Sequence, residues 1–253
     1  MIKRHIKILE ILSAQHSVKV TLLAEMLDIS QVTVRKDLDI LEKRGFICRI
    51  HGYACLDGAD NAGKDLVHCY SIKQRIAKTA AATVKDGETV MLESGSCCAL
   101  LAEELVAAQR NVTIVTNSFF IIGFIRHLPQ IKIILLGGYY QPESQVFVGP
   151  VTTKCGEIFH SDKFFMGVDG FLQNFGFTGR DYLRVQTAMD LSKYAREVFV
   201  LTEAAKFQRH SAVDLISFDK LTGVYTDEGI PVDAEETLFK NRVNLYKVPV
   251  HDA

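Results

Sequence analysis

Residues 21–45 read TLLAEMLDISQVTVRKDLDILEKRG and decide how the first part of the chain folds. The stretch opens with three apolar residues at helical spacing: Leu23, Met26 and Leu27. These residues predict the apolar face of a short helix that ends at Asp28 and Ile29. The chain is then expected to turn.

A second helix is predicted after this turn. Ser30 stands directly before it and has the hydroxyl oxygen that an N-cap residue uses to accept a hydrogen bond from the first helical turn. Three apolar residues then recur at helical spacing: Val34, Leu38 and Leu41. They predict the buried stripe of the helix, and Gly45 predicts its end.

Polar and basic side chains occupy the other face of this second helix. Two helices joined by a tight turn are typical of the helix-turn-helix, whose second helix presents its N-terminal residues to the major groove. Gln31 and Thr33 can reach base edges, while Arg35 and Lys36 suit phosphates or guanine. Most charge clusters are only a solvated helix face. The ordered series of helix, short helix, cap and basic helix favours a DNA-binding module.

The flanking residues complete this module. Residues 3–14 carry apolar residues at helical spacing and predict a helix. Residues 46–56, FICRIHGYACL, alternate apolar and polar residues around Gly52 and predict a small hairpin. Arg49 and His51 would lie on this wing, beside the DNA backbone. Residues 1–56 hold nine Lys and Arg against six Asp and Glu, so this is the basic part of a chain whose net charge is -1.

Residues 20–56 resemble the winged helix-turn-helix of the DeoR family of bacterial transcription regulators. The family pattern is kept at these positions: Ser30, Thr33, Val34, Arg35, Asp37, Leu38, Leu41, Glu42, Gly45, Arg49, His51 and Gly52. Lys36 replaces a second Arg and loses its planar fork, and Tyr53 replaces a second Gly. The resemblance implies double-stranded DNA as a partner and these DNA-binding residues: Ser30, Gln31, Thr33, Arg35, Lys36, Arg49 and His51.

The rest of the chain predicts an α/β domain. Residues 57–71 are polar and without periodicity, as in a linker. A helix is expected over residues 72–87. Strands and helices then alternate from 88 to 138, which predicts a largely parallel sheet with helices on both faces. Ligands bind such sheets beyond the carboxyl ends of the strands.

The segment ESGSCC, residues 93–98, falls at such a strand end. A strand ending at Glu93, a Ser-Gly-Ser turn and a helix starting near Cys97 would expose N–H groups, a positive helix end and two hydroxyls. A phosphate would suit this turn. The same residues also make a good turn and cap without any ligand.

This second part resembles the DeoR-family effector domain, which is similar in fold to ribose-5-phosphate isomerase and glucosamine-6-phosphate deaminase. The family loops fall on residues 93–97, 167–169 with 176–178, and 201–207. The resemblance implies a phosphorylated sugar as ligand and these effector-binding residues: Glu93, Ser94, Gly95, Ser96, Cys97, Asp169, Thr178 and Lys206. The sequence departs from the family pattern at four positions: Glu93 and Glu203 for Asp, Cys97 for Thr and Gln186 for Lys.

Two other functions compete with regulation. A sugar-phosphate isomerase or deaminase would use Asp169 or Glu203 as proton carrier, but the acidic pair and glycine-rich lysine loop of the isomerases are missing. A thiol or metal sensor would use Cys97 and Cys98. A cysteine at a helix N-terminus can have a lowered pKa, whereas adjacent cysteines fit a tetrahedral zinc site poorly. The six cysteines contain no Cys-x-x-Cys pair and are expected to be reduced, buried side chains.

The sequence therefore predicts a winged helix-turn-helix DNA-binding domain over 1–56, a linker over 57–71 and an α/β effector-sensing and oligomerisation domain over 72–253. The longest apolar stretch, residues 119–125, is too short to span a membrane. We expect a cytoplasmic homo-oligomer, a dimer or tetramer, that needs no cofactor or metal. It would bind an operator and repress a carbohydrate-utilisation operon until a phosphorylated sugar binds.

Overall fold

The computed structural model describes residues 3–15, 17–43, 46–56, 66, 68–108, 111–126, 128 and 132–250. The chain divides into two compact units, Met1–Ser71 and Ile72–Ala253, and each is described by itself. Most of the predicted linker, residues 57–65 and 67, lies outside the described residues, as does Gly45. Helix α5 begins at Tyr70, two residues before its predicted start.

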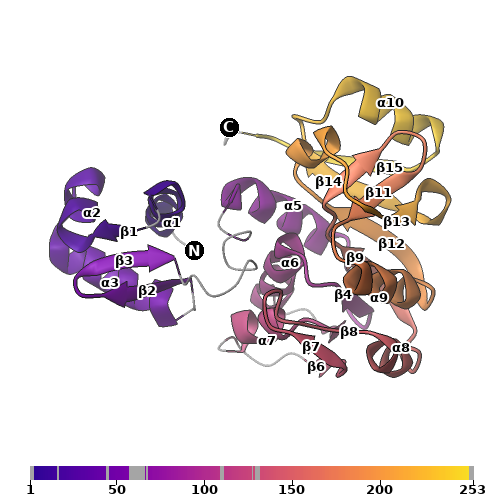
Figure 1. Ribbon diagram of the computed structural model, residues 1–253, viewed down its shortest axis with the longest axis horizontal. Helices are drawn as coiled ribbons and strands as arrows, with labels where there is room; N and C mark the ends of the chain where they lie inside the picture. The colour runs from indigo at the N-terminus through magenta and orange to yellow at the C-terminus, as the bar shows by residue number, and fades with distance from the viewer. Residues whose placement is uncertain are drawn as a thin grey trace. The chain divides into compact units, whose positions relative to one another are not determined.

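Within its described residues, the first unit is a winged fold with helices α1, α2 and α3 (Figure 1). Its elements are α1 (Lys3–Gln15), β1 (Ser17–Lys19), α2 (Val20–Leu27), α3 (Gln31–Lys43), β2 (Ile47–Ile50) and β3 (Tyr53–Leu56). The strands pair antiparallel in the order β1-β3-β2. His51 and Gly52 both have positive φ, as a two-residue hairpin turn requires. The predicted helices and hairpin are confirmed, whereas strand β1 was not predicted from the sequence.

Apolar side chains from the three helices form the core of this unit. The buried side chains include Ile8, Leu9, Leu12, Val20, Leu23, Ala24, Val34, Leu38 and Leu41. The stripe predicted on α3 is therefore confirmed. The stripe predicted on α2 is wrong at Met26, which is 41% exposed, because Ala24 faces the core instead.

The second unit is built on a parallel sheet with the strand order β15-β14-β12-β9-β4-β5-β6 (Figure 1). Its strands are β4 (Thr89–Leu92), β5 (Thr113–Thr116), β6 (Lys132–Leu135), β9 (Ser161–Met166), β12 (Ala195–Leu201), β14 (Gly223–Asp227) and β15 (Asn244–Val248). Every neighbouring pair in this sheet is parallel. The predicted parallel α/β architecture is confirmed.

Helices cover both faces of this sheet, and two small antiparallel groups flank it. The helices are α5 (Tyr70–Ala82), α6 (Ser96–Ala107), α7 (Phe119–Ile125), α8 (Pro150–Gly156), α9 (Tyr182–Ser192) and α10 (Val232–Lys240). The antiparallel groups are the hairpin β7 (Tyr139–Gln141) with β8 (Val146–Val148), and the sheet β10 (Gly170–Leu172), β11 (Gly176–Gly179), β13 (Val213–Ser217). Short 3-10 helices run over Ala204–Gln208 and Phe218–Lys220.

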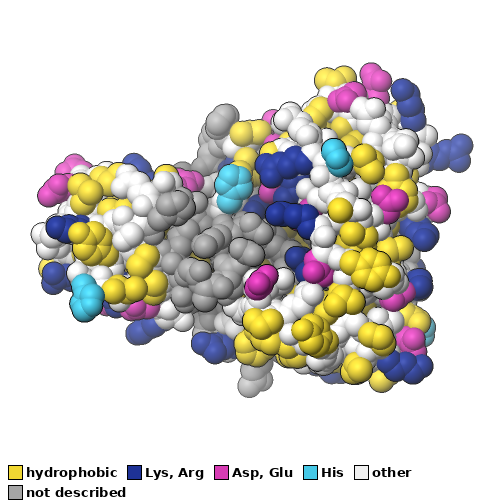
Figure 2. Space-filling model, viewed as in Figure 1, with side chains coloured by type: hydrophobic (Ala, Val, Ile, Leu, Met, Phe, Trp, Pro, Cys, Tyr) yellow, Lys and Arg dark blue, Asp and Glu magenta, His cyan; other side chains and the backbone are white. Residues whose placement is uncertain are grey.

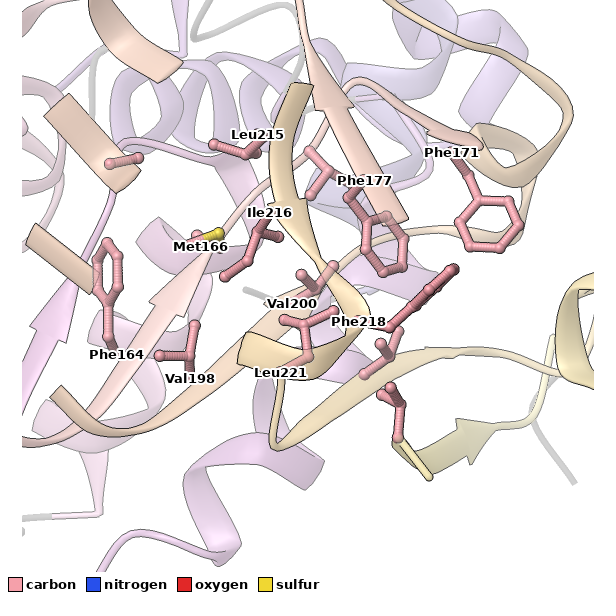
Figure 3. Packing of buried hydrophobic residues seen from close by; sticks show 14 of the residues in the cluster. Phe164, Met166, Phe171, Phe177, Val198, Val200, Leu215, Ile216, Phe218 and Leu221 are labelled. Carbon is pink, nitrogen blue, oxygen red and sulfur yellow. The ribbon is translucent and has the colours of Figure 1, made fainter. Parts of the chain in front are cut away.

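Side chains from both faces of the sheet are buried, which explains why the strands read as nearly continuous apolar runs. On one face, Phe164 and Met166 of β9 pack with Val198 and Val200 of β12, and with Leu215 of β13 (Figure 3). On the other face lies a row of aromatic rings: Phe165, Phe199, Tyr225 and Tyr246. None of the helices in the described part of the chain has both the length and the apolar character of a bilayer span.

Candidate functional site

The N-terminus of α3 is fixed by the turn that precedes it. Asp28 takes the left-handed conformation with φ 52° and turns the chain out of α2. Ser30 Oγ then accepts a hydrogen bond from the backbone N–H of Thr33 at 3.2 Å, and the two hydroxyl oxygens are 2.9 Å apart. Ser30 therefore caps α3 as predicted, and two short helices meet across a three-residue turn.

The solvent face of α3 carries the side chains predicted to contact DNA. Gln31, Arg35 and Lys36 are exposed, and Thr33 is half-buried beside its cap. Val32 is 63% exposed on the same turn, a position that the sequence reasoning did not select. An exposed apolar side chain among polar ones suits contact with a thymine methyl group. The face combines hydrogen-bonding, basic and apolar groups at the N-terminal end of α3, the end that a recognition helix would present to a major groove.

A buried carboxylate holds α3 against α1. Asp37 accepts hydrogen bonds from Arg4 Nη2 at 2.9 Å and lies 3.1 Å from His5 Nε2. Burial alone would raise the pKa of Asp37, but its hydrogen bonds with Arg4 and His5 outweigh burial and lower it. The carboxylate is therefore charged at neutral pH and fixes the orientation of α3 against α1.

The wing hairpin carries Arg49, whose charge is neutralised by nearby carboxylates, and the exposed side chain of His51. Arg49 Nη2 lies 2.7 Å from Asp39 Oδ1, and Arg49 Nε donates to Glu42 Oε2 at 3.0 Å. The hydrogen bond to Glu42 raises the pKa of Arg49. His51 is exposed at the hairpin turn. The structure thus joins Arg49 to α3, so a DNA phosphate would compete with two carboxylates for it.

In the second unit, the predicted loops meet at the carboxyl ends of the strands of the parallel sheet. α6 begins at Ser96 with Gly95 as its N-cap, one residue earlier than predicted. A Cβ atom on Gly95 would lie only 3.0 Å from Gly167 Cα, so the loops after β4 and β9 touch through their backbones. This contact explains why both positions are glycine. It brings the loop at 93–96 beside the loop at 167–169.

Glu93 is the centre of a polar cluster between these loops. Its Oε1 accepts a hydrogen bond from Ser94 Oγ at 2.6 Å, and its Oε2 lies 3.4 Å from the backbone N of Gly167. Arg184, from α9, places Nη2 at 3.3 Å from Glu93 Oε1 and 3.1 Å from Ser94 Oγ. Its Nε is buried without a hydrogen-bond partner. Sequence reasoning missed Arg184.

A second carboxylate and a second arginine lie close by. Asp169 accepts hydrogen bonds from the backbone N and the Nη2 of Arg180, at 3.0 and 3.2 Å. Burial alone would lower the pKa of Arg184, but the charges of Glu93, Asp169 and Asp181 raise it. The Arg184 guanidinium is thus cationic, and each of the two arginines is held by a carboxylate.

These groups line a pocket of about 20 Å³, room for roughly one water molecule. Its lining residues are Glu93, Gly167, Val168, Asp169, Gly179, Arg180, Asp181, Arg184, Val185, Ala188 and Leu215. A sugar phosphate does not fit into this volume. Binding of one therefore requires the loops or the arginine side chains to move, and Arg180, 68% exposed, is placed to do so.

The other predicted effector residues are distributed around this cluster. Lys206 Nζ donates to the Val168 carbonyl at 2.7 Å and so supports the 167–169 loop. Thr178 is fully buried, and its Oγ1 accepts from the Ser211 backbone N at 2.9 Å. Ser96 is half-buried in the first turn of α6. The Glu203 carboxylate lies 3.9 Å from Lys73 Nζ.

The environment of Cys97 differs from the one expected for a thiol at a helix N-terminus. Because α6 starts at Ser96, the side chain of Cys97 turns inward and is only 3% exposed. Burial raises the pKa of Cys97 to about 12, so the expectation of a lowered pKa at the helix terminus is wrong. Cys98 is buried beside it, as predicted. Within the described ranges, no group of three or more His, Cys, Asp and Glu side chains is placed to hold a metal ion.

Comparison with known proteins identifies the class. Residues 4–58 match the family model for a DeoR-like helix-turn-helix domain, and residues 68–228 match that for the DeoR C terminal sensor domain. The chain therefore belongs to the DeoR family. It is a helix-turn-helix transcriptional regulator with a C-terminal sensor domain, and the prediction that it is not an enzyme is confirmed by this membership.

Relatives match over nearly the whole chain. The HTH-type transcriptional regulator GolR of Listeria innocua is 28% identical, with 90% of this chain and 91% of the relative covered. The glycerol-3-phosphate regulon repressor of Escherichia coli is 26% identical over 96% of this chain and 97% of the relative. Ribose 5-phosphate isomerase A of Methanocaldococcus jannaschii aligns with a TM-score of 0.40 at 22% identity, over 55% of this chain and 54% of that one.

Proposed function

We propose that this regulator represses a carbohydrate-utilisation operon and that a phosphorylated sugar relieves the repression. Operator binding is supported most directly by the capped N-terminus of α3. This end of the helix presents Gln31, Arg35 and Lys36 to solvent beside Val32. Regulation of sugar-related genes is supported by a relative that is a glycerol-3-phosphate regulon repressor. We propose that it acts in the cytoplasm, where its operator DNA would be.

The carboxyl edge of the sheet has the chemistry for such an effector. Arg184, with its unpartnered Nε, and the N-terminus of α6 offer donors and positive charge to a phosphate. Glu93 and Asp169 offer carboxylate oxygens to sugar hydroxyls. We propose that the phosphate competes with Glu93 for Arg184. The ion pair would then open, and the loops after β4 and β9 would move with it.

A thermal-shift screen tests the effector site. Phosphorylated sugars and glycerol 3-phosphate are each compared with the phosphate-free compound on the full-length protein. A ligand at 100 times its dissociation constant stabilises by about 2.7 kcal/mol, or roughly 5 to 10 °C for a unit of this size. We expect only phosphorylated compounds to raise the melting temperature.

Two variants of Ser96 locate the binding site. Ser96→Asp places a negative charge in the first turn of α6 and should abolish the shift, because it repels the phosphate. Ser96→Ala removes the hydroxyl without adding charge and should keep most of the shift. The sensor proposal fails if no phosphorylated sugar protects the wild type. A shift of equal size in Ser96→Asp would place the ligand elsewhere.

The sensor unit also has a face suited to self-association. Phe119 on α7 and Tyr139 and Tyr140 on β7 are exposed large apolar side chains, and the rings of Phe119 and Tyr140 are 6.0 Å apart. Figure 2 shows hydrophobic side chains gathered over α7 and the β7–β8 hairpin. Helix-turn-helix regulators read paired half-sites with paired recognition helices. We therefore propose that a second copy of the chain covers this face in a symmetric dimer.

Tyr139→Asp tests this interface. Tyr139 is 66% exposed, so a carboxylate there is harmless in the monomer but is desolvated in a dimer. We expect dimer dissociation to become at least about tenfold easier in sedimentation velocity across a concentration series. The matched control is Phe239→Asp on α10, where the phenyl ring is 82% exposed and the dimer should be unchanged. A wild-type monomer at all concentrations, or an unaffected dimer in Tyr139→Asp, would refute the interface.

A further inference from the structure

Two cysteines face each other across the wing hairpin. Cys48 on β2 and Cys55 on β3 are direct partners in the antiparallel register. Their sulfur atoms are 3.4 Å apart, and Cys55 Sγ also lies 3.5 Å from the Cys48 carbonyl oxygen. Directly opposed residues of an antiparallel pair have Cα atoms about 4.5 to 5.5 Å apart, a separation that a disulfide spans. Closing the bond requires the sulfurs to approach by only roughly 1.4 Å.

The exposure of these two thiols separates them from Cys97 and Cys98 of the sensor unit, whereas Cys69 and Cys155 are half-buried as well. Cys48 and Cys55 are both half-buried, against the expectation that the cysteines would be buried. Cys97 and Cys98 are buried in α6. A small oxidant can therefore reach the hairpin pair without unfolding the protein. The sulfur of the second cysteine is already close enough to react with a sulfenic acid formed on the first.

We propose that Cys48 and Cys55 form a reversible thiol–disulfide site in the DNA-binding unit, oxidised by hydrogen peroxide. One thiol loses its proton and its thiolate attacks a peroxide oxygen; the O–O bond breaks, a sulfenic acid forms, and the leaving hydroxide takes up the proton as water. The second thiol loses its proton and its thiolate attacks the sulfenic sulfur; the S–S bond forms, the S–O bond breaks, and the leaving hydroxide takes up this proton as a second water. Two electrons pass from the two thiols to the peroxide. A low-molecular-weight dithiol returns the pair to the reduced state by exchange.

The position of the pair connects this chemistry to operator binding. Cys48 directly precedes Arg49, whose backbone N donates to Glu42 Oε1 at 3.2 Å and whose guanidinium pairs with Asp39. The disulfide would close a short loop that contains Arg49 and His51. Drawing Cys48 toward β3 shifts this loop against α3. Because both the wing and α3 face the operator in the proposed function, the oxidised form binds DNA more weakly.

Mass spectrometry of the full-length protein tests the site. After treatment with about one equivalent of hydrogen peroxide, the wild type should lose about 2 Da and regain it with dithiothreitol. Peptide mapping should place the bond between Cys48 and Cys55. Cys48→Ser and Cys55→Ser should not lose this mass, whereas the control variants Cys69→Ser and Cys155→Ser should behave as the wild type. No disulfide, or one between other cysteines, overturns the proposal.

An operator-binding titration tests the consequence. The oxidised wild type should bind at least about threefold more weakly than the reduced wild type, as expected when a charged contact is displaced. The double variant Cys48→Ser, Cys55→Ser should bind as the reduced wild type, with or without peroxide. Equal affinity of the two wild-type forms overturns the link to DNA binding. The mass measurement does not depend on an operator, so it stands apart from any failure of the proposed function.

Discussion

Replacing Arg35 by Ala is expected to weaken operator binding by about 10- to 100-fold, a loss of about 1 to 3 kcal/mol for a guanidinium that contacts a base or phosphate. Arg35 is exposed on the second turn of α3, outside the buried stripe of Val34, Leu38 and Leu41. Its substitution removes no packing, so the loss comes from the DNA contact. Fluorescence anisotropy with an operator selected from random DNA measures the affinity.

Lys43→Ala is the matched control for this measurement. Lys43 is also an exposed cation on α3, but it lies in the last turn of the helix. The N-terminal end of a recognition helix contacts the bases, so we expect Lys43→Ala to weaken operator binding by less than about threefold. Unchanged affinity in Arg35→Ala would show that α3 is not the recognition helix. Circular dichroism of both variants should match the wild type.

Asp37→Ala should produce the largest loss of stability in the DNA-binding unit, about 3 kcal/mol. The substitution leaves the buried His5 ring and the Arg4 guanidinium without the carboxylate that holds them. Hydrogen exchange of the α1 and α3 amides in the full-length protein reports the opening of this unit. Asp39→Ala is the control: Asp39 is 51% exposed, and its removal should change the opening free energy by less than about 1 kcal/mol. Equal protection in wild type and Asp37→Ala would refute the anchor.

The same carboxylate predicts how stability depends on pH. Burial would raise the pKa of Asp37, but the hydrogen bonds with Arg4 and His5 make it lower in the folded protein than in the unfolded chain. The contribution of the Asp37 carboxylate to folding stability is therefore present above its pKa in the unfolded chain, near 4. This contribution is lost as the pH falls through the lower pKa of Asp37 in the folded protein. Asp37→Ala should accordingly flatten the acid limb of the stability curve.

Local signals in the sequence were enough to predict the DNA-binding unit. Ser30 before an apolar stripe predicts a capped helix, and alternation around Gly52 predicts a hairpin, because both depend on neighbouring residues. Met26 was placed wrongly because periodicity alone does not show how wide the buried face of α2 is. β1 has only three residues, and its pairing with β3 joins positions 17–19 to 53–55. That contact leaves no local pattern.

The candidate effector site also shows that long-range contacts are not predictable from local sequence patterns. The loop at Glu93 was predictable because a strand end, a small turn and a helix start are adjacent in the sequence. Arg184 reaches Glu93 across 91 positions and belongs to a helix with no visible signal for a binding role. The inward side chain of Cys97 follows from a helix that begins one residue earlier than predicted. Long-range contacts and the exact phase of a helix are fixed by packing, which local patterns do not encode.

We propose that an effector bound at the carboxyl ends of the sheet strands, near Glu93 and Arg184, controls operator binding. The most direct test is an operator titration of the full-length protein without and with the sugar phosphate that gives the largest thermal shift. Coupling between two sites is commonly about 1 to 3 kcal/mol. We expect a saturating sugar phosphate to weaken operator binding by at least about fivefold in the wild type and to leave Ser96→Asp unaffected. Identical operator affinity with and without a saturating, thermally protective sugar phosphate would contradict the claim.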